Sequence, residues 1–191
     1  MSKTDKRKAI LEAVEKVFRN RRFDEVTLDE IAAVARVGKG TIYLYFEDKE
    51  DLFLQMVQER LRGQYAAVEA IVFSGEAVRD KLIALAASAS ELIQRHHCAF
   101  KLLHSPEFAP QRPGAREIMV QYHEQIDGLL EGVFREGIEQ GGLRADLDTA
   151  EATCLFRGLI LSRNLRALHG GGTFALDRLV DLLMQGIQNA G

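Results

Sequence analysis

One short stretch of the chain decides the fold, Val37-Gly38-Lys39-Gly40-Thr41-Ile42-Tyr43-Leu44-Tyr45-Phe46. Its pattern predicts a short helix over residues 38–45. Just upstream, Thr27 is followed three residues later by Glu30. This is the pattern of a capping box, and it predicts another helix over residues 27–35. Two short helices joined by a tight turn predict a helix-turn-helix unit.

The front of the second short helix suits contact with double-stranded DNA. Its first turn carries Lys39 and Thr41, and a recognition helix presents such side chains to base edges and phosphates. Gly40 removes bulk, so the backbone can approach closely, while Ile42 and Phe46 can anchor the helix to its neighbours. The tyrosine hydroxyls can donate to phosphate oxygens. A three-helix unit whose tyrosines serve packing is the alternative, and the pattern alone leaves it open.

Helical patterns also fill the rest of the chain, and no run of alternating polar and apolar residues predicts a strand. The chain is therefore expected to be all-α. Three prolines between residues 104 and 114 predict a connection with at most one short helix. Asp48, Asp148 and Thr173 stand where N-caps are expected. The other helices are predicted over residues 5–20, 48–72, 76–97, 115–140, 149–168 and 174–189.

The charge of the chain is unevenly distributed. Of its 191 residues, 25 are Lys or Arg and 28 are Asp or Glu, which gives a formal net charge of −3. Residues 1–22, however, carry eight basic and three acidic side chains. A basic end on an acidic body is expected where one end meets a polyanion, although a solvated basic helix face would give the same charges.

Composition argues against several other classes of protein. Hydrophobic residues make up 47% of the chain, which argues against a largely disordered protein. No apolar run approaches the ~18–20 residues of a membrane span, and no signal-peptide core follows the basic N-terminus. A cytoplasmic protein without membrane contact is therefore expected. The two cysteines, Cys98 and Cys154, predict neither a disulfide framework nor a metal pair, and no cofactor is expected.

Residues 9–56 resemble the N-terminal domain of the TetR/AcrR family of bacterial transcriptional regulators, over about a quarter of the chain. The matching stretches are Ala9–Ala13, Phe23–Ala32 and Val37–Leu52. The resemblance implies a three-helix DNA-binding domain over residues 1–50 and a larger helical domain over 51–191 that binds a small effector and dimerises. It also implies a ligand-responsive repressor, not an enzyme, that binds a palindromic operator as a homodimer and is released by a small molecule.

The resemblance further implies which residues touch the operator. Three positions depart from the family pattern: Arg36 stands where the turn usually has Gly, Gly38 where Ser is common, and Arg22 where Gly is common. Gly is favoured there because it tolerates positive φ, which is costly for Arg, so either the turn is altered or Arg36 adds a DNA contact. The expected DNA-binding residues are Thr27, Arg36, Lys39, Gly40, Thr41, Tyr43, Tyr45 and Lys49.

The predicted helix 149–168 is apolar on two sides, so it is either deeply buried or shared between a core and a partner. One of these sides consists of Ala152, Leu155, Phe156 and Leu159. With the last helix, the other side would form a four-helix interface across a twofold axis, whereas a monomeric core is the alternative. The expected interface residues are Cys154, Gly158, Leu161, Leu165, Leu179, Leu183 and Ile187.

The effector site is expected on the middle helices, where apolar walls and a few polar groups suit a small molecule. Its candidates are Phe100, His104, Met119, Tyr122, His123, Ile126 and Phe156, although these residues also suit a core. Two rival functions remain: a small all-α enzyme that uses the histidines near residue 97, and a dimeric interaction module that does not read DNA. The histidine spacing matches no zinc site, and no catalytic signature is present.

Overall fold

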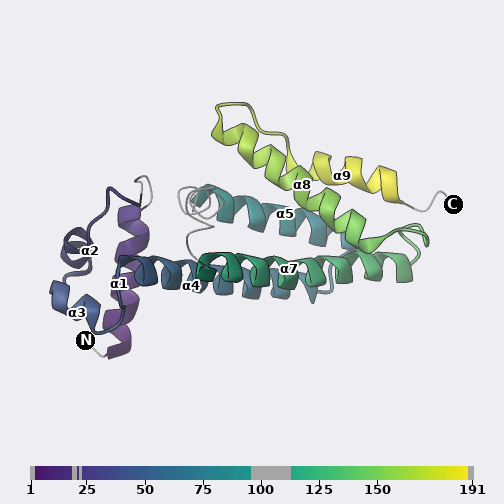
Figure 1. Ribbon diagram of the computed structural model, residues 1–191. Coiled ribbons are helices and arrows are strands. Elements are labelled where there is room, and N and C mark those ends of the chain that lie inside the picture. Colours follow the sequence, from purple (N-terminus) through teal and green to yellow (C-terminus); the bar gives the residue numbers. More distant parts are fainter. Residues whose placement is uncertain (1–2, 19–20, 22, 96–112, 189–191) are drawn as a thin grey trace. The chain divides into compact units, whose positions relative to one another are not determined.

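The computed structural model describes residues 3–18, 21, 23–95 and 113–188, and within these ranges every regular element is a helix (Figure 1). This confirms the all-α prediction. No described helix has an apolar stretch long enough to cross a membrane. The described helices are α1 (Lys3–Phe18), α2 (Leu28–Ala35), α3 (Lys39–Tyr43), α4 (Lys49–Val72), α5 (Val78–Arg95), α7 (Pro113–Glu139), α8 (Thr149–Leu168) and α9 (Leu176–Ile187).

The chain divides into two compact units. The first comprises Met1–Gly63 and Arg95–Val120, and the second comprises Gln64–Gln94 and Gln121–Gly191. Helices α4 and α7 therefore contribute residues to both units. Each unit has its own cluster of buried apolar side chains, and the two clusters share no residue.

The first unit is built on helices α1 to α3 and the beginning of α4. The apolar stripe of α1 buries Ile10 and Val14 completely, and α2 buries Ile31 against them. Three aromatic rings pack together in this core. The ring centroids of Phe18 and Phe53 lie 5.1 Å apart, and Phe23 stacks on Phe18 with a centroid distance of 5.7 Å. Ile31 of α2 and Ile42 of α3 belong to the same buried cluster, which fixes both helices on α1 and α4.

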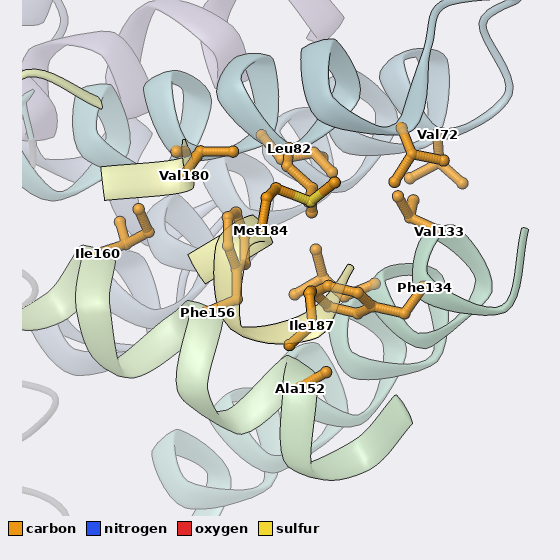
Figure 2. Close-up of a cluster of buried hydrophobic side chains, with 14 of the residues drawn as sticks. Val72, Leu82, Val133, Phe134, Ala152, Phe156, Ile160, Val180, Met184 and Ile187 are labelled. Carbon is orange, nitrogen blue, oxygen red and sulfur yellow. The ribbon is translucent and has the colours of Figure 1, made fainter. Parts of the chain in front are cut away.

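The second unit packs the end of α4 with α5, α7, α8 and α9 (Figure 2). Phe134 of α7 and Phe156 of α8 meet edge to face at 6.4 Å, and Leu82 of α5 is fully buried. Figure 2 shows Val180, Met184 and Ile187 of α9 in the same cluster. The last helix is therefore part of this core.

Local capping signals located most helix starts correctly. Asp48 accepts hydrogen bonds from the N–H groups of Glu50 and Asp51, and Asp148 accepts those of Ala150 and Glu151. The predicted cap of the last helix was wrong, because α9 begins at Leu176 after Ala175, which caps without a side-chain bond. Arginines of α8 hold this connection instead: Arg163 donates to the carbonyl of Phe174, and Arg166 to that of Gly172.

Candidate DNA-binding surface, effector region and dimer face

The turn between α2 and α3 contains a left-handed residue. Arg36 has φ 56° and ψ 44°, and it is the one non-glycine residue with positive φ in the described part of the chain. The N–H of Val37 donates to the carbonyl of Ala32 at 3.0 Å, a bond typical of helices that end in this conformation. The turn thus keeps the conformation that favours glycine, with an exposed arginine in it.

Helix α3 is anchored on one face and open on the other. Ile42 and Phe46 are buried in the first core, as expected from their spacing. Gly38 caps the helix without a side-chain bond, which follows from its missing hydroxyl. A Cβ added at Gly40 would meet nothing within 4 Å, and the side chain of Tyr43 is 53% exposed. The outer face of α3 is therefore free of bulk near its N-terminus and carries an exposed phenol one turn later.

Lys39 lies on this outer face but already has a partner in the chain. Its Nζ lies 2.8 Å from Oδ2 of Asp29, which is in the first turn of α2. The hydrogen bond and the charge of Asp29 raise the pKa of Lys39 above its ordinary value. The sequence reasoning missed Asp29, although its position in the first turn of the helix before the turn was a usable signal.

The start of α2 is held by a network around Glu30. The capping box is formed in full: Thr27 Oγ1 accepts from the N–H of Glu30 at 3.3 Å, and Glu30 Oε2 accepts from the N–H of Thr27 at 2.9 Å. Arg21 donates to Oε1 of the same carboxylate at 2.8 Å. Mainly through the Arg21 bond and then that of the Thr27 N–H, the pKa of Glu30 falls to about 2.

Two other predicted DNA-binding residues hold the unit together. Lys49 Nζ donates to the carbonyls of Phe23 and Val26 at 2.8 and 2.9 Å, and it lies 4.3 Å from the centroid of the Phe23 ring. Tyr45 is half-buried against the first core. The structure thus places Thr27, Arg36, Lys39, Gly40 and Tyr43 on exposed surface, although Thr27 also caps α2. Thr41, Tyr45 and Lys49 are half-buried.

Only five of the seven effector candidates lie in the described residues, and their apolar members are divided between the two cores. Phe100 and His104 lie outside the described residues, and Met119 packs against the first core rather than the second. Ile126 and Phe156 are buried members of the second core, which matches the alternative given for them. Their role as effector contacts stays a prediction.

Tyr122 of α7 places a phenol hydroxyl beside the apolar side chains of the second core. Burial raises the pKa of Tyr122 to about 12, and the charge of Arg157 acts in the opposite direction. Arg157 bridges α8 to α7 through Asp127, with an N–O distance of 2.7 Å. The ring of His123 lies 5.9 Å from that of Tyr122. A half-buried phenol near the charge of Arg157 is suited to recognising a polar group within an apolar surrounding.

Helix α8 carries an exposed apolar face. Of the predicted interface residues on α8, Cys154, Gly158, Leu161 and Leu165 are exposed. Leu179 and Leu183 of α9 are half-buried, and Ile187 is buried in the chain's own core. Leu155, which the sequence grouped with Ala152, Phe156 and Leu159, is 59% exposed, and Leu182 of α9, which was not predicted, is 57% exposed. The inner stripe of α8 includes the polar residues Thr153 and Asn164, which apolar periodicity alone does not reveal.

In the described part of the chain, no group of three or more His, Cys, Asp or Glu side chains could hold a metal ion. The histidines invoked for the enzyme alternative, His96, His97 and His104, lie outside that part.

Comparison with known proteins agrees with the helix-turn-helix geometry. The family model described as "Bacterial regulatory proteins, tetR family" matches residues 10–56. The "Fatty acid metabolism regulator protein" of Bacillus subtilis is 24% identical over 190 residues, with 94% of each chain covered. The "HTH-type transcriptional repressor BepR" of Brucella suis is 25% identical over 191 residues, covering 95% of this chain and 91% of that protein.

A solved structure extends the likeness to the whole fold. The transcriptional regulator FadR from Bacillus subtilis, determined in complex with stearoyl-CoA, superimposes with a TM-score of 0.73 at 21% identity. The alignment covers 93% of this chain and 95% of that one. Together, the formed capping box, the anchored recognition helix and these matches show a DNA-binding domain of the TetR type over residues 10–56, in a chain that is similar along its length to bacterial transcriptional regulators.

Proposed function

We propose that the chain is a ligand-responsive repressor that binds a palindromic operator as a homodimer and leaves it when a small effector binds. The observation that carries the proposal is the outer face of α3, where Lys39, Gly40 and Tyr43 are exposed while Ile42 anchors the helix beneath them. Residues 1–50 would read DNA, and residues 51–191 would bind the effector and dimerise.

In this mechanism two recognition helices enter successive major grooves about 34 Å apart. The effector binds one separation of the two heads better than the other. The effector changes operator affinity by the difference between its binding free energies for the two separations. This difference is typically ~1–3 kcal/mol, or about 5- to 150-fold in affinity.

Selection of bound duplexes from a random DNA pool tests operator recognition. At ~150 mM salt, where non-specific attraction to phosphates is reduced, an enriched inverted repeat is expected. Replacing Lys39 by Ala should weaken binding and relax the enriched sequence, whereas Tyr43→Phe should weaken all sequences alike. The interaction-module alternative would instead be supported if the folded dimer enriches no sequence and neither substitution changes its binding to DNA.

The exposed face of α8 and α9 supports dimerisation, because Leu155, Leu161, Leu165 and Leu182 lie on it in one chain. Apolar side chains exposed together in this way mark interaction sites. Replacing Leu161 by Glu should convert a dimer to a monomer in sedimentation experiments. The matched control is Phe73→Glu, because Phe73 is also an exposed apolar residue but lies after α4 rather than on this face. Equal effects of the two substitutions would remove this face from the proposal.

Cys154 provides an independent readout of the same face. Its side chain is exposed in one chain, so the thiol should react quickly with a maleimide in a monomer and slowly in a dimer. A Cys98→Ser background leaves this thiol alone in the sequence. Labelling that does not slow as protein concentration rises would contradict the proposed dimer.

A long-chain acyl thioester is the effector class we propose, on the basis of the Bacillus subtilis relatives described above. Stearoyl-CoA is the probe, and it should release the protein from the selected operator. Stearate and free coenzyme A are the controls, and each should release it far less. If none of the three compounds changes operator binding, this effector class is overturned, whereas the proposal that the chain is a repressor is not.

A further inference from the structure

The ion pair between Asp29 and Lys39 joins the two helices of the DNA-binding motif. Asp29 lies in the first turn of α2, Lys39 begins α3, and their charged atoms are 2.8 Å apart across the turn. Both side chains are accessible, with exposed fractions of 68% for Asp29 and 48% for Lys39. A DNA phosphate could therefore compete with Asp29 for the same ammonium group.

The two neighbouring acids of α2 have different tasks. Glu30 completes the capping box and binds Arg21, so its carboxylate serves the helix start. The carboxylate of Asp29 instead reaches forward to α3. Asp29 therefore binds the ammonium group of Lys39, which in the proposed function contacts base edges of the operator.

We propose that Asp29 is a specificity-determining residue, which withholds Lys39 from the phosphates of non-operator DNA and releases it to base acceptors of the operator. This inference rests on the proposed function. Phosphate contacts are alike on every sequence, so a cation free to make them adds affinity without discrimination. An acid that competes with phosphate for that cation, and itself repels phosphate, is a repulsive element of the kind that specificity requires.

A double-mutant cycle on a random-sequence duplex tests this role. Asp29→Asn should tighten binding to this duplex about 2- to 5-fold, the range expected for loss of an exposed ion pair. It should also steepen the dependence of log affinity on log salt by about 0.9, which is one added phosphate contact. Lys39→Ala should then weaken binding to the random duplex about 2- to 5-fold more in the Asp29→Asn background than in the wild-type background.

The matched control is Glu47→Gln, which removes the same charge from an exposed residue just after α3. In that background Lys39→Ala should have the same effect as in the wild type. Equal effects of Lys39→Ala in all three backgrounds would overturn the role of Asp29. That outcome differs from failure of the proposed function, in which no sequence is selected from the random pool. Circular dichroism spectra of each variant confirm that it is folded.

Discussion

Replacing Arg36 by Gly is expected to stabilise the first unit. Arg36 has φ 56° and ψ 44°, and this left-handed conformation costs a non-glycine residue about 1–2 kcal/mol. Glycine adopts it freely but loses more backbone entropy on folding, which returns roughly 0.5–1 kcal/mol. The expected net gain in the free energy of unfolding is about 0.5–1 kcal/mol. The bond from Val37 N–H to Ala32 persists, because glycine at position 36 leaves these groups in place.

Urea unfolding followed by far-UV circular dichroism measures this gain, since the chain has no Trp to report by fluorescence. In a separate thermal melt, the melting temperature of Arg36→Gly is expected to be roughly 1–4 °C above that of the wild type, for a chain of this length. The control is Arg36→Ala, which removes the same side chain but leaves a Cβ in the left-handed conformation, and it should give no gain. A glycine variant no more stable than the alanine variant would refute the reasoning.

The same two variants separate strain from recognition. If Arg36 contacts the operator, as the sequence predicts, both substitutions remove the guanidinium and should weaken operator binding equally. A gain in stability for the glycine variant alone, with equal losses of operator affinity in both variants, would show that the turn carries both a backbone cost and a DNA contact.

Three further predictions concern the ion pairs and hydrogen bonds. The lowered pKa of Glu30, about 2, means that its carboxylate stabilises the fold above its ordinary pKa and that this contribution is lost as pH falls towards 2. In urea titrations at stepped pH, Glu30→Gln should therefore be less stable than wild type above about pH 5 and equal to it near pH 2; a constant difference would contradict this. Lys49→Met should lower the free energy of unfolding in urea by about 1–2 kcal/mol, because the Phe23 and Val26 carbonyls lose a charged donor, and Lys49→Arg should lose less. Glu136→Ala should cost about 3 kcal/mol, because Lys81 is 3% exposed and would lose its counterion at 2.7 Å, whereas Lys81→Met with Glu136→Leu should restore most of that in thermal melts.

Local signals located the helices because a helix start depends on residues that are neighbours in sequence. Thr27 and Glu30 form their capping box within four residues, and Asp148 caps α8 through N–H groups two and three residues away. The same signal failed at Thr173. There the connection is bound by Arg163 and Arg166 of the preceding helix, and α9 begins after Ala175 without a side-chain cap.

The candidate site was predicted in outline, but the directions of its charged side chains were not. The pattern around residue 40 identified the recognition helix, and its anchors Ile42 and Phe46 are buried as expected. The partner of Lys39 is ten residues away on another helix, and Lys49 turns back towards a loop more than twenty residues upstream. Pairings at such separations depend on how the helices pack, which residue order does not state.

The sequence by itself determined the all-α fold and the helix-turn-helix, because hydrogen bonds and apolar periodicity within single helices decide these features. The conformation of the turn came from the structure, which gives Arg36 a φ of 56°. Only the tertiary structure decided which faces are covered. It buries Ile187 and exposes Leu155, although both are apolar residues of amphipathic helices. The reason is that burial depends on contacts between helices distant in sequence, and buried polar residues such as Asn164, bonded to Ser90 across the core, alter the stripe that apolar periodicity predicts.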